Sequence, residues 1–205
     1  MKTITKFITV FILALTSLNS YAQEDFTTYD NSYIGKTYKI QISSKEKDDF
    51  KLWIDAMSFD KLHDRGGIKV NAKDYQDFIS AISEAKLKYE EWVKTAKENN
   101  VKELTKTMKI KTKVDGYFEY GDWNFQYNVP LDFTFMILDK NDELNYLLLI
   151  RTGELQSSSN QFMKVDGFAL VFSSTAEIDK FVNAISIEKV NTFLNKPKAK
   201  DLFKD

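Results

Sequence analysis

The feature that most constrains this fold is an uninterrupted helical pattern near the middle of the chain. Apolar side chains recur at spacings of three and four from about Ala72 to Glu98, and neither glycine nor proline interrupts them. Asn71 stands where an N-cap is expected, with Asp74 three residues later. At 1.5 Å per residue such a helix is about 40 Å long. We expect it to lie across a whole sheet.

The segments before this helix alternate between apolar and polar residues, as half-buried strands do. The alternation predicts a small antiparallel meander, preceded by a loose polar leader over residues 23–33. The apolar positions of the meander are Tyr38, Ile40 and Ile42, then Phe50, Leu52, Ile54 and Ala56, then Ile68 and Val70.

The second half of the chain predicts a further set of strands. Asp115-Gly116 is typical of a type I′ hairpin turn, in which both central residues need positive φ. A kink is expected at Gly121, and Pro130 is expected to separate two strands. The expected strands cover residues 108–114, 117–129, 131–138, 144–151 and about 162–172.

Two stretches, residues 146–150 and 168–172, are apolar on both faces. A strand of this kind lies centrally in a sheet that is covered on both sides. The cover is then either the two helices of this chain or one helix and a partner chain, so a homodimer is one expectation.

The second helix is expected to begin at Ser174, with Glu177 completing a capping box. It is expected to continue after a kink near Ser186 and to end before Pro197, ahead of a frayed lysine-rich tail. The predicted fold class is therefore α+β: antiparallel meanders, each followed by a helix, in a single domain over residues 23–205.

Both helices carry a similar segment. Phe78-Ile79-Ser80-Ala81-Ile82-Ser83 matches Phe181-Val182-Asn183-Ala184-Ile185-Ser186 at an offset of 103 residues, and each helix follows a short strand opened by glycine. A ββββα unit used twice, over about 33–100 and 105–195, explains the match. Helical periodicity alone also explains it.

This arrangement resembles the duplicated units of Whirly and Pur-alpha type single-stranded nucleic-acid-binding proteins. Gly67-Ile68-Lys69-Val70-Asn71 leading into Asp74-Tyr75-Gln76-Asp77-Phe78 resembles the strand-to-helix junction of those modules. The resemblance spans roughly two thirds of the chain and implies a fold rather than an activity. No lysine-rich or aromatic nucleic-acid motif accompanies it.

The N-terminus is typical of a cleavable secretory signal peptide over residues 1–22. Lys2 and Lys6 precede an apolar stretch that is too short to span a bilayer. Ser20-Tyr21-Ala22 supplies the small residues for cleavage before Gln23. We expect an exported protein, periplasmic or secreted, without a transmembrane segment after cleavage. An uncleaved N-terminal anchor helix is the alternative.

Charge and cysteine content exclude several classes of protein. The chain has 29 Lys and Arg against 30 Asp and Glu, and cleavage removes two lysines, leaving 27 against 30 and a net charge of −3. This balance argues against nucleic acid as the partner. With no cysteine, disulfides, thiolate nucleophiles and cysteine metal sites are excluded. We expect no metal and no cofactor.

Three further features of the sequence could carry chemistry: a histidine, an acid-rich turn and a lysine stripe. His63, the only histidine, is expected in a surface loop, because no nucleophile motif accompanies it as a catalytic base. The acid-rich turn from Asp139 to Glu143 offers oxygen ligands but lacks the glycine and the distant glutamate of a calcium loop. A lysine stripe is interpreted as protection of an edge strand. Its members are Lys102, Lys106, Lys109, Lys111 and Lys113.

The most aromatic stretch, residues 117–127, supplies the candidate ligand-binding residues Tyr120, Trp123 and Tyr127. Strict alternation places Trp123, Phe125, Tyr127 and Val129 on one face. Aromatic rings beside amides suit contact with carbohydrate or peptide. Packing into the core is the commoner reason for such a face, and it is the interpretation we favour.

The expected function is therefore that of an exported, non-enzymatic binding protein for a macromolecule or a small ligand. A periplasmic hydrolase using a pair of carboxylates is one alternative, since the sequence neither excludes nor locates such a pair. A nucleic-acid-binding type of fold reused outside the cytoplasm is another.

Overall fold

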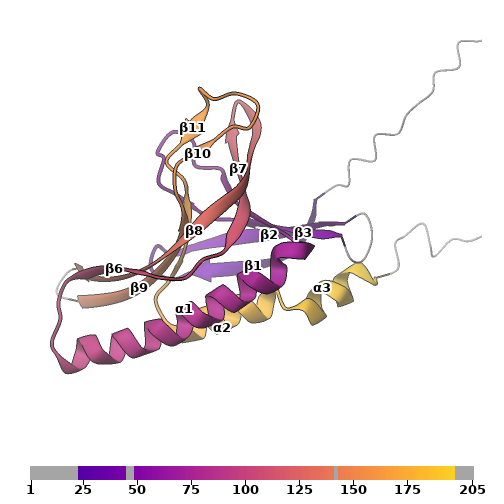
Figure 1. Cartoon of the computed structure of the whole chain (residues 1–205). Helices are drawn as coiled ribbons and strands as arrows, with labels where there is room; N and C mark the ends of the chain where they lie inside the picture. The colour runs from indigo at the N-terminus through magenta and orange to yellow at the C-terminus, as the bar shows by residue number, and fades with distance from the viewer. Residues whose placement is uncertain (1–22, 45–48, 141–142, 197–205) are drawn as a thin grey trace, which may run out of the picture.

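The computed structural model describes residues 23–44, 49–140 and 143–196 (Figure 1). The predicted signal peptide, the centre of the acid-rich turn and the tail from Pro197 lie outside the described residues. The chain is α+β, with one large antiparallel sheet and helices packed on it. The strands are β1 (Glu24–Asn31), β2 (Lys36–Ser44), β3 (Phe50–Asp55), β4 (Met57–Ser58), β5 (Gly66–Asn71), β6 (Leu104–Met108), β7 (Lys113–Tyr120), β8 (Asp122–Lys140), β9 (Glu143–Thr152), β10 (Leu155–Gln156), β11 (Lys164–Val165) and β12 (Phe168–Phe172); the helices are α1 (Ala72–Glu98), α2 (Thr175–Ala184) and α3 (Ile187–Leu194).

Strand order in the large sheet follows chain order almost throughout. It runs β1-β2-β3-β5-β7-β8-β9-β12-β4, with β6 paired to β8. Two meanders are thus joined edge to edge, the first ahead of α1 and the second ahead of α2. The prediction of a loose leader over residues 23–33 was wrong, because residues 24–31 form β1. The Tyr29 ring anchors this strand by stacking on Tyr38 at 5.4 Å.

Strand β8 is shared by both halves of the sheet. Its first half pairs with β7, and its second half pairs with β9 on one edge and β6 on the other. The prediction that Pro130 separates two strands was wrong, because β8 runs through it. It is the last residue paired with β7, opposite Lys113, and it precedes the first residue paired with β9. The ladder needs no N–H from a residue at that point, so the strand continues through it.

The hairpin between β7 and β8 turns at Gly121, not at Asp115-Gly116 as predicted. Gly121 has φ 73°, a conformation that favours glycine. Asp115 and Gly116 instead lie inside β7, paired with Lys69 and Ile68 of β5. The turn preference of the dipeptide is overridden because this stretch is held between two neighbouring strands.

Two other predicted strands are each divided. Residues 108–114 do not form one strand, because β6 pairs with the second half of β8 and β7 with the first. Residues 109–112 carry the chain from one half to the other. The expected strand over about 162–172 is split into β11 and β12, with Gly167 at φ 96° between them.

The strands that are apolar on both faces are covered by this chain itself. Their second face forms a buried cluster of Leu147, Leu149, Ala169 and Val171, against which Tyr33 and Met57 pack. Tyr33 comes from the β1–β2 turn and Met57 from β4, which follows β3 directly and pairs with β12. The sheet therefore curls until its two ends meet.

Helix α1 has the bounds that the sequence predicts. Its buried residues are Tyr75, Phe78, Ala81, Ile82, Ala85, Tyr89 and Ala96. The Tyr75 ring meets Phe50 of β3 edge-on at 5.6 Å. The Tyr89 hydroxyl donates to the carbonyl oxygens of Tyr146 and Ser173 at 3.0 and 2.9 Å. The helix thus packs against both halves of the sheet.

Helix α2 begins as predicted. The Ser174 hydroxyl accepts from the Glu177 N–H at 3.2 Å, and the Glu177 carboxylate accepts from the Ser173 N–H at 2.7 Å. The kink predicted near Ser186 is a break, after which Ser186 caps α3. Helices α1 and α2 lie side by side along one side of the sheet, while the β7–β8 turn and the β10–β11 ribbon project away from them (Figure 1).

Candidate ligand-binding groove

The first half of the sheet turns one face toward α1 and the other away from it. Alternation along β3 buries Leu52 and Ile54 in the core and sends Trp53 and Asp55 to the opposite face. That opposite face also carries aromatic rings from β7 and β8. We call it the outer aromatic face, and it comprises Trp53, Tyr117, Trp123, Phe125 and Tyr127.

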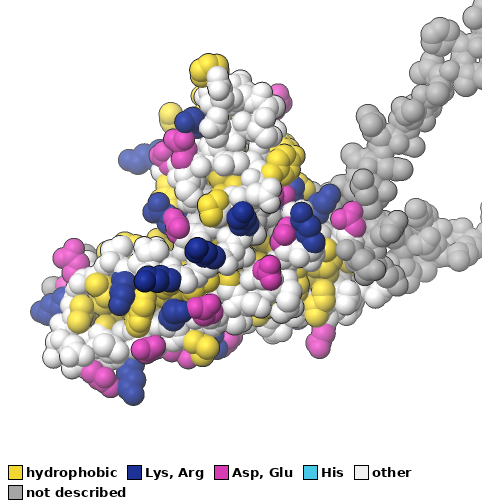
Figure 2. All heavy atoms as spheres, in the orientation of Figure 1, with side chains coloured by type: hydrophobic (Ala, Val, Ile, Leu, Met, Phe, Trp, Pro, Cys, Tyr) yellow, Lys and Arg dark blue, Asp and Glu magenta, His cyan; other side chains and the backbone are white. Residues whose placement is uncertain are grey.

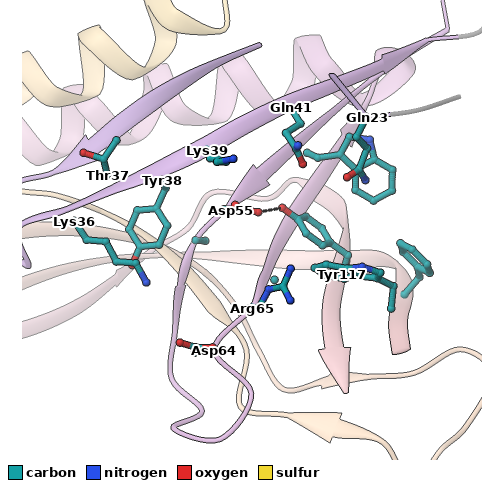
Figure 3. A pocket seen from close by; sticks show the side chains of 15 residues that line it. Gln23, Lys36, Thr37, Tyr38, Lys39, Gln41, Asp55, Asp64, Arg65 and Tyr117 are labelled. Carbon is teal, nitrogen blue, oxygen red and sulfur yellow. Dashed lines mark hydrogen bonds between the residues drawn. The ribbon is translucent and has the colours of Figure 1, made fainter. Parts of the chain in front are cut away.

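A groove of about 650 Å³ opens on the outer aromatic face (Figure 3). This volume lies in the range of small-molecule sites. Aromatic, cationic and acidic side chains all line it. The lining residues are Gln23, Lys36, Thr37, Tyr38, Lys39, Gln41, Trp53, Asp55, Ala56, Asp64, Arg65, Gly66, Tyr117, Trp123 and Phe125.

A carboxylate and a hydroxyl meet inside this groove. The Tyr117 hydroxyl donates to Asp55 Oδ1 at 2.6 Å (Figure 3). Gly67 of β5 stands between the two residues in the register of the sheet. Because Gly67 has no side chain on this face, the tyrosine side chain crosses the intervening strand to reach Asp55.

Burial dominates the titration of this pair. It raises the pKa of the Asp55 carboxyl, and the Tyr117 hydrogen bond and nearby cations oppose that rise without cancelling it. Burial, together with the charge of Asp55, also raises the pKa of Tyr117 well above its usual value. Tyr117 is therefore a neutral donor at neutral pH. No group among the described residues donates to Asp55 Oδ2, so this oxygen is an open acceptor in the groove.

The main chain of Asp55 also accepts a hydrogen bond from a tyrosine. The Tyr29 hydroxyl donates to the Asp55 carbonyl oxygen at 3.0 Å. Burial raises the pKa of Tyr29 well above its usual value, and neighbouring Tyr38 and Asp55 add to the rise. Two neutral tyrosine hydroxyls thus fix Asp55 from its side chain and from its main chain.

Three exposed cations stand around the groove. The Arg65 guanidinium pairs with Glu119 and lies 5.4 Å from the centre of the Trp123 ring. Lys36 Nζ lies 5.1 Å from the centre of the Tyr38 ring. Lys39, the third, is 3.6 Å from an exposed aspartate, a pairing that contributes little in solvent. All three cations remain accessible to a ligand.

A second hollow of about 450 Å³ lies farther along the same sheet. Lys69 Nζ is 2.9 Å from Asp115 Oδ2 and lies 5.2 to 5.7 Å from the ring centres of Tyr127, Trp53 and Phe125. This ammonium is buried, and an aspartate together with three rings compensates for the lost water. The second hollow is lined by Asp49, Lys51, Lys69, Asn71, Ala72, Lys73, Asp115 and Tyr127.

Asp115 holds this arrangement together. Its carboxylate accepts from the Asn71 side chain at 3.0 Å and from the Asn128 N–H at 3.1 Å, besides pairing with Lys69. Burial acts to raise the pKa of Asp115, but these hydrogen bonds and the lysine charge outweigh it and lower the pKa. Asn71 is drawn into this network, which explains why its side chain does not cap α1.

No single hollow contains all three predicted ligand-binding residues. Trp123 is 48 % exposed and lines the groove. Tyr127 is 56 % exposed and lines the second hollow. Tyr120 lines neither, because its ring stacks on His63 with 4.1 Å between ring centres.

The favoured interpretation of this aromatic stretch as core was wrong for its exposed members. A bulge on β8 at Tyr127 and Asn128, where Asn128 has φ 56°, inserts one extra residue. Val129 therefore returns to the core, while Phe125 pairs with Tyr117 on the outer aromatic face. Strict alternation fails at the bulge.

His63 lies in the predicted polar loop, between β4 and β5. Its Nδ1 is 3.3 Å from Asp60 Oδ2, and its ring is half-buried against Tyr120. It lines neither the groove nor the second hollow. Its contacts are those of a side chain that shapes a loop.

The lysine stripe is not confined to one strand. Only Lys106 lies in β6, which pairs only with β8 among the described strands and is an edge strand, as interpreted. Lys102 precedes β6, Lys109 and Lys111 follow it, and Lys113 begins β7, which lies between β5 and β8. Figure 2 shows lysine and arginine side chains interspersed with acidic ones over the face in view, without a continuous basic patch. Within residues 23–44, 49–140 and 143–196, no group of three or more His, Asp or Glu side chains is placed to hold a metal ion.

Three site residues were not predicted from the sequence: Asp55, Tyr117 and Lys69. The signal available was the polar half of the alternation in β3 and β5, where Trp53, Asp55 and Lys69 occupy the positions between core residues. That pattern shows that they share faces within a strand. It does not show which strands are neighbours.

Comparison of the chain with protein-family models, with curated proteins and with solved structures finds no match. In the part of the chain that the structure describes, no helix combines the length and the apolar character needed to cross a membrane.

Proposed function

We propose that this protein is an exported, non-enzymatic binding protein whose groove takes a carbohydrate. One observation carries the proposal: the partly exposed rings of Trp53 and Trp123 share a groove with the open carboxylate oxygen of Asp55. Sugar rings present apolar faces that stack on aromatic rings. Their hydroxyls pair with carboxylates, amides and cations.

The balance of energies favours such a ligand. A hydroxyl that donates to Asp55 Oδ2 would form a hydrogen bond with a charged acceptor, which contributes about 1.5–3 kcal/mol. Exposed Lys36, Lys39 and Arg65 offer donors to the ligand's oxygen atoms. A purely apolar ligand would cover Asp55 Oδ2 without offering it a donor, at a cost.

The proposal is tested on mature protein, residues 23–205, applied to immobilised chito-, cello-, xylo- and galacturonide oligomers. Binding in solution is then followed by tryptophan fluorescence. Asp55→Asn is expected to weaken binding about tenfold, which corresponds to about 1.4 kcal/mol. Asp166→Asn, an exposed acid outside the groove, is the control and should bind normally. Absence of binding to every oligomer, or binding that Asp55→Asn leaves unchanged, would contradict the proposal.

A carboxylate-dependent hydrolase is the second candidate, favoured by the presence of both Asp55 and Asp64 along the same groove. Hydrolysis of a glycosidic bond needs two carboxyl groups on either side of that bond. Incubation of the same oligomers with the protein, followed by measurement of new reducing ends, separates the two functions. We expect no release. Release that Asp55→Asn and Asp64→Asn each abolish would establish the hydrolase instead.

We also propose that the protein is exported and that its two halves arose by internal duplication. The leader supports export, and sequencing of the secreted protein is expected to begin at Gln23. Duplication is supported by the matching burial of Phe78 with Phe181 and of Ile82 with Ile185.

A further inference from the structure

We infer that the groove and the second hollow form one continuous binding track for an extended oligosaccharide of several units. This inference rests on the proposed carbohydrate-binding function and adds the length and the path of the ligand. It starts from the fact that both hollows open on the outer aromatic face.

The two hollows share a wall. Trp53 and Phe125 line the groove, and Lys69, which lines the second hollow, lies over both of their rings at 5.3 and 5.7 Å. Trp53 and Lys69 are direct partners in the register of β3 and β5, so no other strand separates them. A ligand leaving the groove therefore passes over this ring-and-lysine cluster into the second hollow.

The track is longer than a single sugar ring. Along β3 and the residue that follows it, the groove reaches Ala56 and the second hollow reaches Lys51. Five steps at about 3.3 Å per residue separate these positions by about 16 Å. Two aromatic side chains, each about half exposed, lie along this distance: Trp123 lines the groove, and Tyr127 lines the second hollow opposite Asp115, level with the Trp53–Lys69 pair.

Charge along the track favours a chain of hydroxyls over a chain of phosphates. Its cations are Lys36, Lys39, Lys51, Arg65, Lys69 and Lys73, and its acids are Asp49, Asp55, Asp64 and Asp115. Single-stranded nucleic acid also binds to grooves with aromatic rings and lysines, but such grooves are positively charged throughout. The open oxygen of Asp55 would repel a phosphate, whereas it accepts from a hydroxyl.

The test measures affinity against ligand length. The chito-, cello-, xylo- and galacturonide series at one, three and six units are titrated calorimetrically into mature protein. In the series that binds, affinity is expected to rise about tenfold or more from one unit to six. Tyr127→Ala should weaken binding of the six-unit oligomer about fivefold to tenfold and change that of the single unit less than about twofold. Phe162→Ala, at an 83 % exposed ring outside both hollows, is the matched control.

The outcomes separate the inference from the function on which it rests. Absence of binding at every length refutes the carbohydrate-binding function itself. Binding that does not change with length, or that Tyr127→Ala leaves intact at six units, refutes only the continuous track. A salt-sensitive affinity for oligo-dT that Tyr127→Ala weakens, without saccharide binding, would assign the face to single-stranded nucleic acid and overturn the inference.

Discussion

Replacing Tyr117 by phenylalanine removes one hydroxyl from the groove and keeps the buried ring. The hydroxyl donates to Asp55 Oδ1 at 2.6 Å, and no other described group donates to that carboxylate. A hydrogen bond to a charged acceptor contributes about 1.5–3 kcal/mol to stability, against about 0.5–1.5 kcal/mol between neutral groups. At neutral pH we expect Tyr117→Phe to lower the free energy of unfolding by about 2 kcal/mol.

The cost of this substitution should depend on pH. The folded-state pKa of Asp55 is raised above 3.8 by burial, so its contribution to stability is present below the unfolded pKa and is lost as pH rises through the folded pKa. The Tyr117 hydrogen bond opposes the rise in pKa. Removing that bond raises the folded pKa further and increases the loss between acid and neutral pH. At about pH 3, where the carboxyl is protonated, the cost should fall to about 1 kcal/mol.

Urea unfolding followed by circular dichroism at about pH 3 and about pH 7 measures both values. Tyr29→Phe is the matched control, because its hydroxyl donates to the Asp55 carbonyl oxygen and not to the carboxylate. Its cost should be about 1 kcal/mol at both pH values. A cost of Tyr117→Phe that is equal at the two pH values, or larger in acid, would show that the Tyr117 hydroxyl does not stabilise an ionised Asp55 carboxylate.

Three further substitutions test the sheet and the helix start, each by urea unfolding at neutral pH. Lys69→Met should lower the free energy of unfolding by about 3 kcal/mol, because it leaves the buried Asp115 carboxylate without its cation. Adding Asp115→Asn should recover part of this loss, and no recovery would argue against the ion pair. Gly67→Ala should cost about 2 kcal/mol, because a Cβ there would lie 2.0 Å from a backbone oxygen, whereas Gly153→Ala, with open space around it, should stay within about 0.5 kcal/mol. Equal effects at the two glycines would contradict the packing. Ser174→Ala should cost about 1 kcal/mol by removing the cap of α2, and an unchanged stability would count against that cap.

The tertiary structure decided features that no local pattern in the sequence records. The Asp115-Gly116 dipeptide favours a turn, yet it lies in a strand because Lys69 and Asn71, both of β5, hold the Asp115 side chain. The bulge at Asn128 likewise depends on the Asp115 carboxylate, which accepts from the Asn128 N–H. Contacts between distant strands outweigh turn preferences that are worth about 1 kcal/mol or less.

Some residues of the candidate site were predicted from the sequence and others were not. Trp123 and Tyr127 were predicted from aromatic composition, and both lie on the outer aromatic face. Asp55 and Tyr117 were not predicted, since they are 62 residues apart in sequence and become neighbours only when β5 lies between their strands. Tyr120 was predicted and faces His63 instead.

Elements with local signals could be predicted from the sequence. The bounds of α1, the alternation in β2, β3 and β5 and the Ser174 cap were all legible, because periodicity and capping act over three to five residues. No local pattern predicts that two meanders form one curled sheet, or that a carboxylate, a tyrosine and four further rings share one of its faces. Strand alternation specifies which residues share a face of one strand, whereas the groove depends on which strands lie next to each other in the sheet.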